Sequence, residues 1–311
     1  MLACSEESFS RSEGVDKILG SIMSRVSSQL SCALVAMLIC LSLVAKEITL
    51  SKPERQGVSS ERLKKITEHM NEKVEDGTMA GGMGLIARNG RIIYQQTYGF
   101  ADREAGRAME NDAIYRIYSM TKPLTTVAAM MLYEEGCFQL DDHVAKYLPE
   151  FGDTPVWRGG DAPITDVEEQ RSPMLVKQLM SHTSGLTYHF MNSTPVDAQY
   201  REQAIEFQSH SESLAEMTRR LASIPLLCQP GDQWNYSVAT DVLGRLVEVL
   251  SGMRLADFFR QRIFAPLKMI DTGFSVPEQT QHRFASLYGP AVGGDMSSVG
   301  GAAAPVPQEE R

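Results

Sequence analysis

The sequence has few cysteines, and it has no cysteine or histidine spacing that is typical of a metal site. Of its five cysteines, Cys4, Cys32 and Cys40 lie near the N-terminus, and only Cys137 and Cys228 lie in the body of the chain. We therefore predict no disulfide framework, and one bridge between the last two cysteines is the single alternative. Neither Cys-x-x-Cys nor His-Glu-x-x-His occurs, so a zinc site has little support.

The chain also lacks an excess of basic residues. Its formal net charge is −9, which argues against a nucleic-acid partner because phosphate binding needs a basic surface. Hydrophobic residues make up 43% and charged residues 22% of the 311 positions, as in ordinary globular proteins. A chain of this length can form one large domain or two.

One apolar run without a charge, Leu30–Ala45, lies near the N-terminus. It is shorter than the about 20 residues of a membrane-spanning helix, but it suits the core of a signal peptide, with Arg25 before it. We interpret residues 1–48 as a leader with a signal segment near 23–45, and we expect export to the periplasm or the medium. The alternatives are membrane attachment through the leader alone, and a cytoplasmic protein in which the run is a buried helix.

The first elements of the body are predicted to be a helix and a hairpin. A helix is expected over 59–77, with Ser59 or Ser60 as its cap and Gly77 at its end. Residues 82–99 contain two apolar runs around Asn89-Gly90, a pair favoured in two-residue hairpin turns. This order suggests a sheet with a helix packed on one face.

The middle of the chain is predicted to be mainly helical. The segment 155–172 is interpreted as a polar loop, and the sequence after about 288 as a coil rich in Gly, Ala and Pro. No further strands are expected after the hairpin. Helices are predicted by apolar spacing and by Gly or Pro at the ends in the following ranges: 120–136, 141–148, 173–180, 211–223, the later part of 230–253, and 255–267.

Ser119 and Lys122 form the only Ser-x-x-Lys of the chain. A helix is predicted to begin at Ser119, where backbone N–H groups and the helix dipole favour developing negative charge. Residues three apart share a helix face, so Lys122 is expected beside Ser119. A lysine desolvated in a pocket can lose its proton and become a general base for a serine nucleophile. The plain alternative is a serine N-cap followed by a solvated lysine.

Five stretches in one order resemble the serine β-lactamase and penicillin-binding protein superfamily, and its class C-like branch with the family VIII carboxylesterases in particular. The resemblance covers roughly residues 55–290. It implies an α+β fold of the β-lactamase/transpeptidase type, with an antiparallel sheet flanked by helices and a mainly helical region. The stretches are YGFADREAGRAM (98–109), IYRIYSMTKPLT (114–125), LMSHTSGL (179–186), QPGDQWNYSVATDVLGRLVEVLSG (229–252) and IFAPLKMIDTGF (263–274).

The second motif of this family is similar to Tyr236-Ser237-Val238. The resemblance implies that Tyr236 points its hydroxyl at Ser119 and shares the serine proton with Lys122. Val238 stands where many members have an amide that holds β-lactam or peptide substrates, which favours an esterase. His182 is interpreted as structural, because the chain has no Gly-x-Ser-x-Gly elbow. A core tyrosine with a satisfied hydroxyl is the alternative for Tyr236.

The third motif of the family, an x-Gly pair on a late strand that lines the site, has no convincing counterpart. We therefore expect the C-terminal strands to be missing. We divide the chain into the leader, an incomplete hydrolase domain at 55–290, and a tail at 291–311. The hypothesis is that the chain is truncated or frame-shifted, with a tail from about 290 that is not family sequence, and is poorly active.

The resulting prediction is a serine hydrolase that works through an acyl-enzyme, with Ser119, Lys122 and Tyr236 as catalytic residues. Its partner is a small-molecule ester or β-lactam, and the chemistry needs no metal or cofactor. A carboxylesterase is the first choice, and a class C-like β-lactamase or D-Ala-D-Ala carboxypeptidase is the second. A non-catalytic binding protein on the same fold is the alternative from another class. The oligomeric state is left open.

Overall fold

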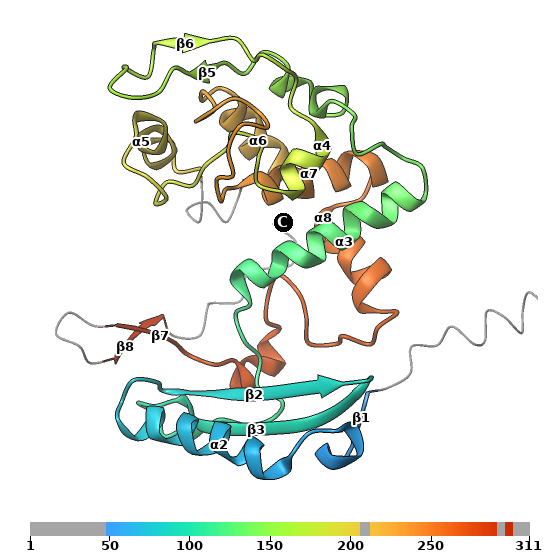
Figure 1. The fold of residues 1–311 in the computed structure, drawn as a ribbon, viewed down its shortest axis with the longest axis vertical. Coiled ribbons are helices and arrows are strands. Elements are labelled where there is room, and N and C mark those ends of the chain that lie inside the picture. Colours follow the sequence, from blue (N-terminus) through green and yellow to red (C-terminus); the bar gives the residue numbers. More distant parts are fainter. Residues whose placement is uncertain (1–47, 206–211, 291–295, 301–311) are drawn as a thin grey trace, which may run out of the picture. The chain divides into compact units, whose positions relative to one another are not determined.

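The structure is a computed structural model that describes residues 48–205, 212–290 and 296–300 (Figure 1). These described residues all belong to one compact unit. The predicted leader lies outside the described residues apart from its last position, so export stays a prediction. Within the described ranges, no helix is both long and apolar enough to cross a membrane.

A long hairpin forms the centre of the sheet. Strand β2 (Gly81–Arg88) pairs antiparallel with β3 (Arg91–Asp102). The turn between them places Asn89 at φ 51° and Gly90 at φ 67°, which are the left-handed angles that a two-residue hairpin turn requires. The hairpin predicted from Asn89-Gly90 is confirmed.

Two short strands and one helix complete this part of the fold. Strand β1 (Thr49–Leu50) runs parallel to β3, and β4 (Arg107–Ala108) pairs with the end of β3. Helix α2 (Ser60–Glu75) packs against β3 and lies along the hairpin in Figure 1. The Ser59 side chain caps it by accepting the Arg62 N–H at 3.3 Å, as predicted.

Helices α3 (Thr121–Glu134) and α7 (Ala239–Ser251) pack against each other in the helical region. The buried face of α7 carries apolar residues at helical spacing, which explains why it forms a helix and which side it buries. On α3, the apolar side chain of Val127 is 49% exposed. The fully buried apolar side chains of α7 are Ala239, Val242, Leu243, Leu246 and Val247.

The remaining elements of the helical region surround this pair. The α-helices are α4 (Val176–Met180), α5 (Pro195–Glu202), α6 (Leu214–Ala222) and α8 (Leu255–Phe259), which continues into the π-helix η5 (Arg260–Phe264). The short strands are β5 (Val156–Trp157) and β6 (Val167–Glu168). The 3₁₀ helices are η1 (Pro53–Gln56), η2 (Tyr118–Met120), η3 (Val144–Lys146), η4 (Pro149–Phe151) and η6 (Glu278–Arg283).

Most predicted helices are confirmed, and two local predictions are wrong. The helix expected over 141–148 is only the 3₁₀ turn η3. The segment 155–172 is not simply a loop, because β5 and β6 pair antiparallel within it. Two-residue strands leave too little alternation for a sequence pattern to reveal them.

The coil predicted after about 288 is also wrong. Strand β7 (Leu287–Pro290) pairs antiparallel with β8 (Met296–Gly300), so strands do follow the first hairpin. Among the described strands these two pair only with each other and do not extend the β1-β3-β2 sheet. Backbone pairing needs no apolar alternation, and a Gly-rich strand specifies its register weakly, which is why the sequence pattern did not show them.

Candidate active site

Ser119 lies in the 3₁₀ turn η2, directly before α3. The α-helix was expected to begin at Ser119, but it begins two residues later at Thr121. Tyr118 has a φ of 39°, which is strained for a bulky residue. The serine side chain is exposed, and its N–H has no backbone acceptor among the described residues. Both the hydroxyl and the N–H are therefore available to a bound substrate.

The structure brings Ser119, Lys122 and Tyr236 together. The Tyr236 O–H donates to Ser119 Oγ at 2.6 Å, and Lys122 Nζ donates to the same oxygen at 3.4 Å. Lys122 Nζ also lies 4.5 Å from the centre of the Tyr236 ring and 5.3 Å from that of Tyr188. The predicted residues thus share one cluster, and their catalytic roles stay a prediction.

We expected Lys122 to lose its proton and act as a neutral base, but its surroundings favour the charged ammonium. Desolvation works to lower the pKa of Lys122, but hydrogen bonds and charge interactions with Tyr236 and Tyr188 outweigh it, and the pKa lies above its usual value. Desolvation works to raise the pKa of Tyr236, but Lys122 and Ser119 outweigh it, and the pKa is lowered. The neutral lysine base is therefore not favoured. The geometry favours an ammonium beside a phenol that deprotonates easily.

His182 contacts the cluster from the side and does not reach the serine in the described contacts. Its Nδ1 lies 3.2 Å from Ser237 Oγ, and its ring centre lies 4.8 Å from that of Tyr236. Burial and the charge of Lys122 lower the pKa of His182, which favours the neutral imidazole. These contacts agree with the structural role predicted for this residue.

Trp234 lies two residues before Tyr236 in the sequence. Its side chain is 65% exposed, and it contacts the rings of His182 and Tyr236. It does not line the pocket described below. It therefore covers the outer side of the cluster.

The cluster opens into a pocket of about 1180 Å³. Helix α7 forms one wall through side chains at helical spacing, and apolar residues of α6, α8 and the loops form much of the rest. Sequence reasoning missed most of this lining, since the residues come from segments far apart in the chain. The chief additions to the predicted site are Tyr188, Phe190, Asp241, Arg245, Leu255 and Phe274.

Asp241 is a missed acidic residue that lines the same pocket as Lys122 and Tyr236. It lies in the first turn of α7, and its exposed side chain lines the pocket, with protein close around it. Desolvation raises the pKa of Asp241 to about 6, against the charge of Lys122, which acts to lower it. The sequence contained one signal for Asp241. It lies five residues after Tyr236 and directly before the apolar residues Val242 and Leu243 of α7.

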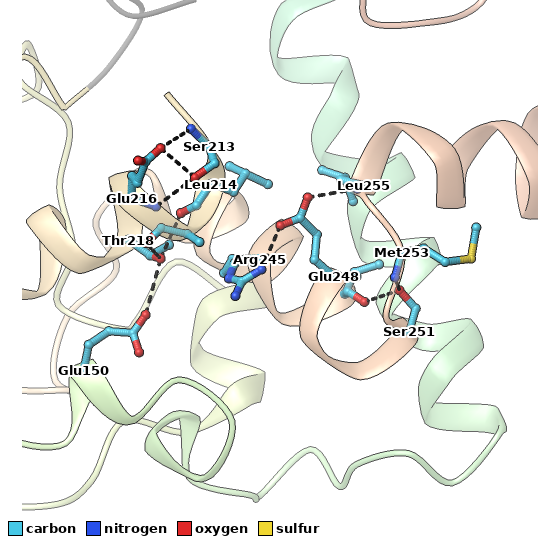
Figure 2. A network of polar contacts seen from close by, with 12 residues as sticks. Glu150, Ser213, Leu214, Glu216, Thr218, Arg245, Glu248, Ser251, Met253 and Leu255 are labelled. Atoms are coloured by element: carbon cyan, nitrogen blue, oxygen red, sulfur yellow. Dashed lines mark hydrogen bonds and ion pairs between the residues drawn. The ribbon is translucent and has the colours of Figure 1, made fainter. Parts of the chain in front are cut away.

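Further along the same wall, the charged side chains are paired (Figure 2). Arg245 donates to Glu248 at 3.1 Å, and Glu248 also accepts the Leu255 N–H at 3.0 Å. Figure 2 shows these residues near the Ser213–Glu216 capping box at the start of α6. Within the described residues, no group of three or more His, Cys, Asp or Glu side chains could hold a metal ion.

Comparisons with known proteins agree with this fold and cluster. A family model described as Beta-lactamase matches residues 66–306, so the chain belongs to the beta-lactamase family. The match continues past residue 290, where we expected the family sequence to end. The predicted domain boundaries at 55 and 290 stay predictions.

Two curated relatives illustrate the likeness. Esterase EstB from Burkholderia gladioli is 36% identical over 220 residues, covering 70% of this chain and 52% of the relative. Protein Rv1367c from Mycobacterium tuberculosis is 34% identical over 220 residues, covering 70% of this chain and 53% of the relative. The chain therefore spans about half the length of the curated relatives it matches.

Solved structures show the same α+β fold of the β-lactamase/transpeptidase type. EstCE1, described as a hydrolase with promiscuous acyltransferase activity, superposes with a TM-score of 0.66 at 31% identity, covering 77% of this chain and 59% of that chain. Simvastatin synthase (LovD) from Aspergillus terreus superposes with a TM-score of 0.65 at 26% identity, covering 77% and 60%. The fold class predicted from the sequence is confirmed.

Proposed function

We propose that the protein is a serine hydrolase that forms an acyl-enzyme at Ser119. The observation that carries the proposal is the shared contact of Tyr236 and Lys122 with Ser119 Oγ, at 2.6 Å and 3.4 Å. A nucleophile within hydrogen-bond reach of a base, with a third group that tunes the base, is the arrangement that activates a serine.

The contacts support a mechanism in which Tyr236 carries the proton. Ser119 Oγ attacks the substrate carbonyl and passes its proton to the Tyr236 phenolate, which the Lys122 ammonium stabilises. The Ser119 N–H donates to the oxyanion of the tetrahedral intermediate. When the C–O bond of the ester breaks, Tyr236 returns the proton to the leaving alcohol. Water then attacks the acyl-enzyme and gives its proton to Tyr236. Tyr236 returns that proton to Ser119 Oγ as the bond between the acyl carbon and Oγ breaks, and the acid is released.

An ester substrate is the first choice within this class. Val238 is buried, and its N–H donates to the Thr187 carbonyl at 3.2 Å. Val238, the last residue of the second motif, therefore presents no side-chain amide to the pocket that could bind a lactam or peptide. The names of relatives point the same way, because EstB is called an esterase and EstCE1 a hydrolase. We propose a carboxylesterase acting on small esters.

The proposal is tested by labelling and turnover. The full chain is treated with a fluorescent fluorophosphonate and assayed with p-nitrophenyl butyrate and with a chromogenic cephalosporin. We expect labelling and ester turnover in the wild type and in Ser223→Ala, an exposed serine outside the pocket, and neither in Ser119→Ala.

Three outcomes would contradict the proposal at different levels. Cephalosporin turnover without ester turnover would favour a β-lactamase. Labelling without turnover would describe a crippled enzyme. A folded wild type that is not labelled at Ser119 would overturn the hydrolase and favour a binding protein on this fold.

We also propose that the protein is exported. The support is the uncharged run Leu30–Ala45 with Arg25 before it. N-terminal sequencing of the protein recovered from its native cell would show a start within or after this run. An intact N-terminus in the cytoplasmic fraction would contradict export.

A further inference from the structure

The charged residues of α7 that line the pocket are Asp241, Arg245 and Glu248. They follow one another at intervals of four and three, so they lie along one face of the helix. The opposite face is buried in the core. The helix thus presents a row of alternating charge to the pocket, with Asp241 at the end nearest in sequence to Tyr236.

Arg245 could pair with Asp241, since residues four apart on a helix are neighbours. It pairs instead with Glu248, at 3.1 Å (Figure 2). Glu212, another acid of the pocket wall, is held in a two-pronged ion pair by Arg220. The remaining cation of the lining is Arg254, the N-cap of α8. No described side chain forms an ion pair or hydrogen bond with the Asp241 carboxylate.

The ionisable groups of the active-site cluster line the same pocket as Asp241. They come from α3 through Lys122, from the segment after α4 through Tyr188, and from the loop before α7 through Tyr236. His182 lies against Tyr236 and is neutral in character. The Asp241 carboxylate is therefore a negative charge without an ion-pair partner among the described residues, in the same pocket as the Lys122 ammonium and the two tyrosine phenols.

We propose that Asp241 is a positioning residue for the hydrolase, which acts through Lys122 and Tyr236 and keeps the shared proton on that pair. The inference rests on the proposed function of Ser119. A carboxylate near the pair makes loss of its proton less favourable, whether the proton leaves the phenol or the ammonium, because either step adds negative charge or removes positive charge. The pair becomes a stronger base toward Ser119 and a poised acid for the leaving group.

The direction of the effect can be measured at Tyr236 itself. Removing the carboxylate should lower the pH at which Tyr236 ionises, by about 0.5 to 1 pH unit. The same change should move the rising limb of the pH profile of Ser119 labelling to lower pH. The plateau of that profile should fall about two- to fivefold, because the base is weaker. A residue that only supports the helix would change neither midpoint.

The experiment uses the full chain labelled with ¹³C at the tyrosine ζ carbon. The Tyr236 signal is assigned by its loss in Tyr236→Phe, and its midpoint is titrated in wild type, Asp241→Asn and Asp241→Glu. Asp257→Asn is the matched control, because that acid pairs with Arg260 and does not line the pocket. If Asp241→Asn fails to fold, Asp241→Ser replaces it, since serine is a favoured residue near a helix N-terminus. Fluorophosphonate labelling of Ser119 is followed over the same pH range.

The inference is supported by a lower Tyr236 midpoint in Asp241→Asn, a return toward the wild-type midpoint in Asp241→Glu, and no change in Asp257→Asn. An unchanged midpoint in a folded Asp241→Asn or Asp241→Ser variant overturns it. The titration needs no activity, so this result is separate from the test of Ser119. Normal labelling with an unchanged midpoint leaves the hydrolase standing, and a shifted midpoint without labelling leaves only the electrostatic role.

Discussion

Among single residues, Tyr236 carries more of the proposed chemistry than the Ser-x-x-Lys pair suggests. The Tyr236 hydroxyl oxygen lies 2.6 Å from Ser119 Oγ, while Lys122 Nζ lies 3.4 Å from the same atom. The pKa of Tyr236 is lowered and that of Lys122 is raised, with the two groups interacting directly. The lysine charge is therefore best used to stabilise the phenolate, and the phenolate to accept the serine proton.

Replacing Tyr236 by phenylalanine tests this division of labour. We expect Tyr236→Phe to slow Ser119 labelling and ester hydrolysis by about 10²- to 10⁴-fold, the usual contribution of a general base. The midpoint of thermal unfolding should change little. Tyr133→Phe is the control, because that ring packs against Phe138 away from the pocket. Equal rates in both variants would exclude Tyr236 as the base.

Asp241 also makes a prediction about stability against pH. Desolvation raises its pKa to about 6 from a usual value near 3.8, so the folded state holds the proton more tightly than the unfolded state. Its contribution to stability is full below the unfolded value and is lost as the pH rises through 6. Asp241→Asn should therefore raise the unfolding temperature relative to wild type more at pH 7.5 than at pH 3.5.

The control for this comparison is Asp257→Asn, which removes a carboxylate paired with Arg260 outside the pocket. It is not expected to gain stability between the two pH values. A difference between Asp241→Asn and wild type that is the same at pH 3.5 and pH 7.5 would contradict the raised pKa of Asp241.

Among elements, the loop after α4 positions residues of the active-site cluster. Gly185 has a φ of 85°, and its carbonyl accepts the Leu227 N–H at 2.7 Å. This pairing fixes the loop that carries His182 and Tyr188 against the segment that leads to Tyr236. The glycine is needed both for its backbone angle and for space.

A pair of glycine variants separates these two needs. An alanine Cβ at Gly185 would lie 2.3 Å from the Cys228 carbonyl oxygen, whereas at Gly136 it would meet nothing within 4 Å. Both positions have positive φ, at 85° and 76°. We expect Gly136→Ala to cost about 1 kcal/mol of unfolding free energy, and Gly185→Ala to cost about 3 kcal/mol or more. Urea unfolding measures both, and equal costs would contradict the steric argument.

In the molecule as a whole, the segment before β7 contacts both the end of β3 and the segment that leads to Ser119. Ile114 forms a parallel bridge with Phe284, and the Ser286 N–H donates to the Ala101 carbonyl at 2.8 Å. Arg283 connects two distant segments, because its guanidinium pairs with Asp271 at 2.6 Å and with Asp112 at 3.0 Å. These contacts position the strand end and the run that leads into Ser119.

Arg283→Gln is therefore expected to destabilise the fold by about 1 to 3 kcal/mol, the range for hydrogen bonds to charged groups. The Arg283 side chain is 19% exposed, while that of Arg260, which pairs with Asp257, is 68% exposed. Arg260→Gln should change the unfolding free energy by less than about 0.5 kcal/mol. Chemical denaturation of the two variants makes the comparison, and an equal loss would show that Arg283 does not bind the late segment to the rest.

The local signals of the sequence were enough for much of the fold. Asn89-Gly90 indicated the hairpin and Ser59 the start of α2, because turn and cap preferences depend on a few neighbouring residues. The sequence did not reveal very short or Gly-rich strands. Whether such a segment forms a strand depends on the strand that it pairs with rather than on its own residue pattern. The β5–β6 and β7–β8 pairs are examples.

The sequence by itself determined the family, the fold class and the identity of Ser119, Lys122 and Tyr236 as candidates, because these depend on residue types in a linear order. Only the tertiary structure decided which group holds the proton. That depends on distances and desolvation across α3, the loop before α7 and α7 itself, which no linear spacing contains. The same reason hid Asp241, whose carboxylate shares a pocket with Lys122 only when α7 packs against α3.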